Sequence, residues 1–298
     1  MVDRPFVVEP PGDAVRVRRL AEHAASVWGL PEPELMRVGM NALYVAGDEV
    51  VIRIGRPTSD PGGALRLAEL LRAHGIRVPT FVRAAAIIDG PLAAMAIARE
   101  HTAGEIDWPS VGEMVARVHA IDPSTIDPFY PVPRCTTFPW WQFDGLLADV
   151  ADLLDDTARR GIIEAIMRHR EWPARAASRW VLCHGDVHPG NVLATAGGAV
   201  LIDWDLLCRG PVGWDHAPLL TWAERWGGEP GLYERFATGY GASLRSETTA
   251  EAIAELRLVA ATLMRLRLGR SDPAAAVEAE QRLRFWRGDP DAPAWQAA

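Results

Sequence analysis

A short loop in the second half of the chain holds the side chains best suited to chemistry. It reads HGDVHPGN over residues 184–191, and a second acidic stretch, DWD, follows at residues 203–205. Asp186 lies five positions before Asn191, which lies twelve positions before Asp203. A carboxylate can orient an attacking hydroxyl group, and magnesium binds oxygen ligands that include one or two carboxylates. The spacing therefore predicts that Asp186 acts as a base and that Asn191 and Asp203 hold a magnesium ion beside phosphate groups.

The polar residues of this loop have a structural explanation as well as a functional one. A single Asp or Asn in a loop rich in Gly and Pro is usually a turn residue, but three of them at these offsets favour the functional interpretation. For His184 we favour backbone hydrogen bonds that shape the loop. His188 is close enough to Asp186 to act near the phosphates, although a structural role is favoured there too. Asp205 is expected to support the site.

Residues 1–98 have the pattern of a small antiparallel sheet with two helices. Apolar residues recur at helical spacing over residues 13–28 and 64–74, and the second pattern stops at Gly75, which can adopt a left-handed conformation. Short segments rich in Val and Ile, separated by turn residues, predict strands at 35–38, 42–46, 50–54, 81–88 and 92–98.

Residues 99–298 are mostly helical by the same criterion. Two short apolar strands, at 180–182 and 200–202, bracket the polar loop. The tail after Arg287, which is rich in Pro and Ala, is expected to be loosely ordered. Helical periodicity covers the segments 111–121, 143–155, 159–169, 215–226, 232–240 and 250–268.

Composition limits the classes of protein. A chain of 298 residues, 49 % of them hydrophobic, has room for one or two cores. The formal charge of −8 argues against nonspecific nucleic-acid binding, and no apolar run reaches the roughly 18 residues of a membrane span. Three widely spaced cysteines do not fit a disulfide framework, and the first residues do not resemble a secretory signal. We therefore expect a cytoplasmic protein.

Three motifs together resemble one family. HGDVHPGN at 184–191, LIDWD at 201–205 and GPVGWD at 210–215 are similar to the motifs of the aminoglycoside phosphotransferase and choline kinase family, the small-molecule branch of the protein-kinase-like fold. Weaker matches extend the resemblance over about residues 35–220. It implies an α+β, bilobal fold, with a nucleotide-binding lobe at 1–98 and a catalytic lobe at 99–298.

The resemblance also implies an activity. Members transfer the γ-phosphate of ATP, or of GTP, bound with Mg²⁺, to a hydroxyl group of a small molecule. We expect an aminoglycoside or another antibiotic as the acceptor, and choline, homoserine or a sugar as the alternatives. A protein acceptor is disfavoured, because Gly210-Pro211 follows Asp203 within a few residues and leaves no room for a long activation segment.

Further roles are carried over from the family. Asp215 would brace the catalytic loop from the following helix, although a plain helix N-cap is an equal alternative. The turn at Gly39–Asn41, and Asn41 within it, would cover the phosphates. Backbone groups from Ile97 to Arg99, where the lobes join, would hydrogen-bond the adenine.

The cation that grips the phosphates must be an arginine. The chain has no lysine, so its 31 basic residues are all arginines. Arg53 stands on the expected strand where kinases place a lysine, and its guanidinium can hold phosphate bidentately. The family's helical glutamate falls on Ala64, and the nearest acid, Glu69, fits a surface ion pair with Arg66 and Arg72 better than a partner for Arg53.

Acceptor-binding residues are expected among aromatic and acidic side chains, which together suit a cation. Core packing is the other interpretation for each tryptophan, because most tryptophans are buried. The candidates flank the catalytic loop in sequence: Trp140, Trp141, Asp144, Trp214 and Glu224.

Two other classes compete with a kinase. GDVH at 185–188 resembles one fragment of the dinuclear metallophosphatases, but the other motifs of that class are not evident in the sequence. A non-catalytic nucleotide-binding module of the same fold is the second alternative. The intact set of Asp186, Asn191 and Asp203 argues against it.

Overall fold

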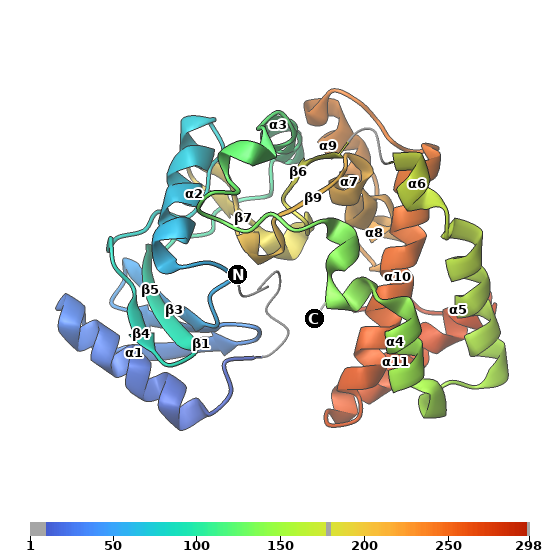
Figure 1. Cartoon of the computed structure of the whole chain (residues 1–298), viewed down its shortest axis with the longest axis horizontal. Coiled ribbons are helices and arrows are strands. Elements are labelled where there is room, and N and C mark those ends of the chain that lie inside the picture. The colour runs from blue at the N-terminus through green and yellow to red at the C-terminus, as the bar shows by residue number, and fades with distance from the viewer. Residues whose placement is uncertain (1–9, 177–179, 297–298) are drawn as a thin grey trace.

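The computed structural model describes residues 10–176 and 180–296. One half of the molecule is an antiparallel sheet with helices α1 (Ala14–Trp28) and α2 (Pro61–Ala73), and the other half is mainly helical (Figure 1). The mixed α+β class predicted from the sequence is confirmed. Among the described residues, no helix combines the length and the apolar character that crossing a membrane requires.

The five-stranded sheet has the order β1-β2-β3-β5-β4, with every neighbouring pair antiparallel. Four of the predicted strands are confirmed within one or two residues. The fifth, expected at 81–88, is wrong in length, because only Ile87–Asp89 joins the ladder and Phe81 forms an isolated bridge to Ile97. The intervening Arg-Ala-Ala-Ala lacks the β-branched side chains that favour strands. The strands are β1 (Glu34–Val38), β2 (Ala42–Ala46), β3 (Val50–Gly55), β4 (Ile87–Asp89) and β5 (Leu92–Ala98).

Two capped helices flank this sheet. Asp13 caps α1, which buries an apolar face that includes Val17 and Leu20 against the sheet. Asp60 caps α2, whose first residue is a proline, a usual start signal. The helix therefore begins three residues before the predicted start at Ala64. Leu67 and Leu71 of α2 belong to the core of the helical half, so α2 ties the two halves together.

All six helical segments predicted for the second half are present, but two of them are divided. The segment at 143–155 ends as a helix at Asp149, and the segment at 215–226 breaks at Thr221. Helices α6 and α11 lie outside the predicted segments. The helices are α3 (Trp108–His119), α4 (Phe143–Asp149), α5 (Asp156–His169), α6 (Trp172–Ala176), α7 (Gly213–Leu220), α8 (Trp222–Arg225), α9 (Leu232–Tyr240), α10 (Thr248–Leu268) and α11 (Pro273–Trp286).

Two small ladders frame the polar loop. Strand β6 (Trp180–Cys183) pairs with β9 (Cys208–Pro211), and β7 (Val192–Thr195) pairs with β8 (Gly198–Leu201), both antiparallel. The loop 184–191 connects β6 to β7, and residues 202–207 connect β8 to β9. Both loops therefore run from one ladder to the other, and their ends lie at paired strands.

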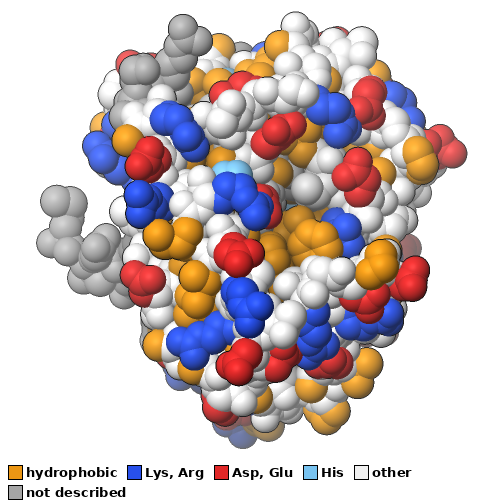
Figure 2. Space-filling model, turned by 90° about the vertical axis from the view of Figure 1, so that its right-hand side faces the viewer, with side chains coloured by type: hydrophobic (Ala, Val, Ile, Leu, Met, Phe, Trp, Pro, Cys, Tyr) orange, Lys and Arg blue, Asp and Glu red, His pale blue; other side chains and the backbone are white. Residues whose placement is uncertain are grey.

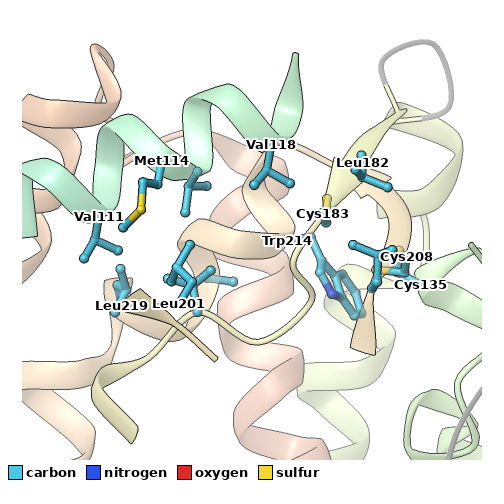
Figure 3. Close-up of a cluster of buried hydrophobic side chains, with 14 of the residues drawn as sticks. Val111, Met114, Val118, Cys135, Leu182, Cys183, Leu201, Cys208, Trp214 and Leu219 are labelled. Atoms are coloured by element: carbon cyan, nitrogen blue, oxygen red, sulfur yellow. The ribbon is translucent and has the colours of Figure 1, made fainter. Parts of the chain in front are cut away.

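A dense apolar core lies beneath this framework. Side chains of α3, including Met114 and Val118, face Trp214 and Leu219 of α7 across the ends of the short strands (Figure 3). The three cysteines, Cys135, Cys183 and Cys208, are free and buried in the same cluster. The polar loop thus rests on a packed surface, which restricts its movement.

The C-terminal tail contradicts the expectation of loose order. Trp295 is only 2 % exposed and lies in a second core with α5, α10 and α11. Its backbone amide donates to the carbonyl of Arg225 at 2.7 Å. A tail rich in Pro and Ala can still be fixed by one large apolar side chain that finds a pocket.

Candidate active site

Asp215 fixes the start of the polar loop. It lies in the first turn of α7, whose N-cap position is Val212, so the N-cap alternative does not hold. Its fully buried carboxylate accepts hydrogen bonds from the backbone amides of His184 and Gly185, each at 2.8 Å. Gly185 has φ of 98°, and a Cβ there would lie 2.0 Å from the Leu206 carbonyl oxygen. Only glycine fits this turn.

His119 on α3 supplies the counter-charge for Asp215. Its Nε2 lies 3.1 Å from the Asp215 carboxylate and its Nδ1 lies 3.0 Å from the Tyr240 hydroxyl. Burial alone would lower the pKa of His119, but the hydrogen bonds to Asp215 and Cys183 outweigh burial and raise it to about 9. The same contacts lower the pKa of Asp215 despite its burial. The brace is therefore a buried ion pair at neutral pH.

Asp186 is held from several sides. The Asn191 amide Nδ2 donates to the Asp186 carbonyl at 2.9 Å and to Oδ2 at 3.3 Å, and His188 Nε2 lies 3.4 Å from the same Oδ2. Burial would raise the pKa of Asp186, but His188 and Arg257 lower it well below its usual range. Its side chain keeps 27 % exposure, so an ionised carboxylate remains accessible.

The two loop histidines have different surroundings. His184 Nδ1 accepts from the Asp186 amide at 3.3 Å, so its Nε2 carries the proton and donates to the Ile202 carbonyl at 3.0 Å. Burial lowers the pKa of His184, which keeps it neutral. These contacts suit the loop-shaping role favoured from the sequence. His188 Nδ1 accepts from the Gly190 amide at 3.1 Å, while its Nε2 faces Asp186.

Two carboxylates follow β8. Asp203 has a left-handed backbone with φ of 64°, which is uncommon for a residue other than glycine. Burial and the neighbouring charge of Asp205 raise the pKa of Asp203 to about 6. Asn191 uses its Nδ2 on Asp186, and among the described residues no donor reaches its Oδ1. Asp203 and Asn191 therefore offer oxygen atoms to a cation.

Arg53 finds its partner in Asp205 instead of an acid on α2. The Arg53 guanidinium donates to Asp205 Oδ2, and the Asn41 side-chain amide donates to the same oxygen at 3.3 Å. Glu69 is exposed and makes no ion pair within the described part of the chain. The expected surface pairing is wrong, because the guanidinium of Arg72 turns toward the Pro79 carbonyl at 3.5 Å.

A cavity of about 520 Å³ lies between the sheet and the loop, and Asp203 and Asp205 line it. Among the backbone groups expected to bind adenine, the amides of Ala98 and Arg99 are already bonded to the carbonyls of Thr80 and Glu49. That part of the expectation needs correction. All four residues predicted to bind the nucleotide line this cavity: Asn41, Arg53, Ile97 and Arg99.

The acceptor candidates separate into two groups. Trp141 and Trp214 are 6 % and 0 % exposed and contact one another at 4.7 Å between ring centroids, so both belong to the core. Trp140 is half-buried beside them, whereas Asp144 and Glu224 are exposed. Core packing, the other interpretation given for each tryptophan, holds for Trp141 and Trp214, and the acceptor roles of the five candidates stay predictions.

Asp144 lines a different hollow from the one that Asp203 lines. This second cavity, of about 330 Å³, is formed between α4, α5 and α10, and Trp141 and Trp172 also line it. Hydrophobic side chains also gather in a hollow between charged ones on the side of the molecule that carries these helices (Figure 2). Asp186 does not line this second cavity.

Sequence reasoning missed three contributors: His119, Tyr130 and Arg257. Tyr130 lines the larger cavity, and its hydroxyl lies 2.6 Å from Thr58. For Arg257 a signal existed, since it is a lone charge on a helical face whose neighbours at three- and four-residue spacing are all Ile or Ala. For His119 and Tyr130 the sequence offered only their residue types.

Comparison with known families agrees with this geometry. Residues 42–259 match the family model described as the phosphotransferase enzyme family. The chain belongs to this family. This phosphotransferase has no significant match among curated protein sequences.

Solved structures share the fold of this phosphotransferase at low identity. One is spectinomycin phosphotransferase with AMP bound (TM-score 0.67, 14 % identity, 92 % of this chain and 98 % of that chain). Another is an aminoglycoside 2'-phosphotransferase with GDP bound (TM-score 0.70, 14 % identity, 93 % and 99 %). A choline/ethanolamine kinase family protein from Mesorhizobium loti is a third (TM-score 0.65, 15 % identity, 94 % and 95 %). The predicted protein-kinase-like fold is confirmed.

Proposed function

We propose that this phosphotransferase moves the γ-phosphate of ATP or GTP to a hydroxyl group of a small molecule in the cytoplasm. Residues 1–98 would bind the nucleotide, and residues 99–298 would carry the catalytic loop. The observation that supports this most strongly is the proximity of Asp203, at the end of β8, to Asp186 and Asn191 of the loop 184–191, beside a cavity that Asp203 and Arg53 both line.

The cavity supports a nucleotide in three ways. Its volume of about 520 Å³ lies within the usual range for small-molecule sites. The backbone amides of Glu100 and His101, which line it, have no hydrogen-bond partner within the described residues, and they would donate to the base in place of Ala98 and Arg99. Arg53 would bind phosphate oxygens once the nucleotide competes with Asp205.

The residues present fit a magnesium ion. Burial and the neighbouring charge of Asp205 raise the pKa of Asp203 to about 6, and a cation held between these carboxylates would favour the ionised form. Asp203 and the Asn191 Oδ1 would hold the ion. When bound, magnesium neutralises charge on the phosphates.

The chain's own residues would then do little covalent chemistry. Asp186 would accept a hydrogen bond from the acceptor hydroxyl and take its proton as the new phosphate ester forms. The buried His119–Asp215 pair would keep the loop amides of His184 and Gly185 in place. Catalysis would come from positioning and charge, as phosphoryl transfer requires.

An aminoglycoside or another antibiotic is the acceptor that we propose. The neighbouring folds include spectinomycin phosphotransferase with ADP and spectinomycin, and an aminoglycoside phosphotransferase with GDP and kanamycin. Choline-like alcohols, homoserine and sugars stay as alternatives, since a choline/ethanolamine kinase family protein has the same fold.

The proposal is tested by measuring nucleoside diphosphate release from Mg·ATP and Mg·GTP across aminoglycosides, spectinomycin, macrolides, amino alcohols and sugars. We expect acceptor-dependent release that disappears in Asp186→Ala. Tight nucleotide binding with a blank panel would indicate a non-catalytic binding module instead.

A further inference from the structure

An arginine of α10 reaches the catalytic loop from a helix that the family motifs do not include. Arg257 lies in the middle of α10, next to the buried Leu256 and Leu258. Its own side chain is 14 % exposed. Removing a guanidinium from water is unfavourable unless hydrogen bonds and charge compensate, so its partners identify what holds it there.

Those partners belong to the catalytic loop. One terminal nitrogen of Arg257 donates to the Gly185 carbonyl at 3.1 Å, and the other donates to Asp186 Oδ1. The fork thus joins the loop backbone and the carboxylate of the residue expected to act as the base. A planar guanidinium with two such bonds restricts the side-chain rotation of Asp186 more than a single point contact would.

Two tryptophans hold the guanidinium in this orientation. Its central carbon lies 5.3 Å from the Trp140 ring and 5.5 Å from the Trp214 ring. The indole nitrogens of both rings are buried without a hydrogen-bond partner among the described residues, so the rings contribute apolar surface and π-face attraction here. An apolar side chain would fill this space equally well. The hydrogen bonds to the loop are what an apolar residue would lack.

The contacts distinguish the two oxygens of Asp186. Oδ1 is taken by Arg257, whereas Oδ2 has only the longer contacts to Asn191 and His188, at 3.3 and 3.4 Å. A carboxylate oxygen can accept more than one hydrogen bond, so Oδ2 has capacity for a further donor.

We propose that Arg257 is a positioning residue that locks Asp186 with Oδ2 toward the acceptor hydroxyl. This inference rests on the proposed function, because it assigns Asp186 as the base. Arg257 itself touches no reacting atom. Its loss would leave Asp186 charged and present but free to rotate, and small misplacements of a catalytic group cost large factors in rate.

The test compares Arg257→Met, which keeps length and apolar contact, with Arg257→Lys, which keeps charge but not the fork. The matched control is Arg267→Ala on the same helix, where the arginine is 57 % exposed. Turnover is measured as hydrolysis of Mg·ATP and Mg·GTP, with water as the probe acceptor. We expect Arg257→Met to lower kcat about 10- to 100-fold with KM for the nucleotide unchanged, and Arg257→Lys to fall between it and wild type. The control should match wild type.

Chemical rescue distinguishes positioning from a purely structural role. If Arg257 positions Asp186, adding guanidinium chloride at low millimolar concentration to Arg257→Ala should restore part of kcat, and should restore nothing in Asp186→Ala. A purely structural role predicts no rescue in either variant. Equal kcat in wild type and Arg257→Met, or a higher kcat in the variant because Arg257 blocks the base, would overturn the inference.

A second measurement does not depend on turnover. Hydrogen exchange of the peptide covering 183–191 should be faster in Arg257→Met than in wild type and Arg267→Ala, with the melting temperature within a few degrees. Unchanged exchange would overturn the inference even if the wild type hydrolysed no nucleotide. A blank panel of small-molecule acceptors with tight nucleotide binding would count against the proposed function instead.

Discussion

At the scale of single residues, the site contains two carboxylates, Asp203 and Asp205, close to one cation, Arg53. Asp205 takes the counter-ion role that the family's helical glutamate would fill, and Asn41 adds a hydrogen bond to the same oxygen. This arrangement links the sheet directly to the loop that follows β8, across the cavity. It explains how Arg53 keeps a counter-ion in a chain with no acid at the expected place on α2.

Arg53→Ala should weaken binding of Mg·ATP or Mg·GTP about 10- to 100-fold, because hydrogen bonds to charged groups contribute about 1.5–3 kcal/mol. Isothermal titration measures this directly. Arg66→Ala, an exposed arginine on α2, is the control and should bind as wild type does. An affinity for Arg53→Ala equal to that of the parent would show that Arg53 is only a strand residue.

The raised pKa of Asp203 predicts a pH dependence for metal–nucleotide binding. Asp203 binds a cation only when ionised, and its pKa near 6 means that affinity should rise as the pH increases through about 6. Asp205→Asn removes the repulsion, which should move the midpoint to lower pH. Comparing the two proteins by titration at pH 5 to 7.5 cancels the nucleotide's own titration. Coincident midpoints would contradict the coupling.

At the scale of elements, α3, α7 and the loop 184–191 meet at the buried pair His119–Asp215. The pattern of the sequence located the loop and its flanking strands because β-branched segments and turn residues alternate there. It did not locate β7 or β9, although the predicted strands β6 and β8 are equally short; β9 contains Gly210 and Pro211, residue types that are depleted in strands. Nor could it find His119 as a partner, since a histidine at a helix end acquires its role only from what packs against it.

The His119–Asp215 pair predicts a loss of stability in alkali. The pKa of His119 is raised from its ordinary value of 6.5 to about 9 in the folded protein. Its contribution to folding is therefore complete below pH 6.5 and is lost as the pH rises through 9, by roughly 3 kcal/mol at most. Urea unfolding from pH 6 to 10 should show this fall. His119→Gln should be less stable at pH 6 and should lack that part of the pH dependence.

At the scale of the whole molecule, the fold is two halves joined through α2 and the chain around residues 98–103, with the site between them. The order of most elements followed from periodicity, and the bilobal α+β class followed from the resemblance of the motifs to a known family. The position of the C-terminal tail did not, because its burial depends on a pocket made by helices far away in sequence. Trp295 contacts Trp226 and Phe285 there, at 5.4 and 5.8 Å between ring centroids.

Trp295→Ala should reduce the free energy of unfolding by about 3–5 kcal/mol, because it removes a large buried side chain and leaves a cavity. Chemical denaturation gives the value, and Trp295→Phe should lose less. Nucleotide affinity should stay the same in both variants, since no residue of the tail lines the cavity that Arg53 lines. A stability equal to wild type would mean that the tail is not part of the core in solution.

The central claim is that Asp186 accepts the hydroxyl proton beside a bound nucleotide. The direct measurement is turnover and nucleotide affinity of Asp186→Asn, which preserves shape but removes the carboxylate. We expect a loss of turnover of about 10²- to 10⁴-fold, with nucleotide affinity within a few-fold of wild type. Turnover equal to wild type in Asp186→Asn would contradict it.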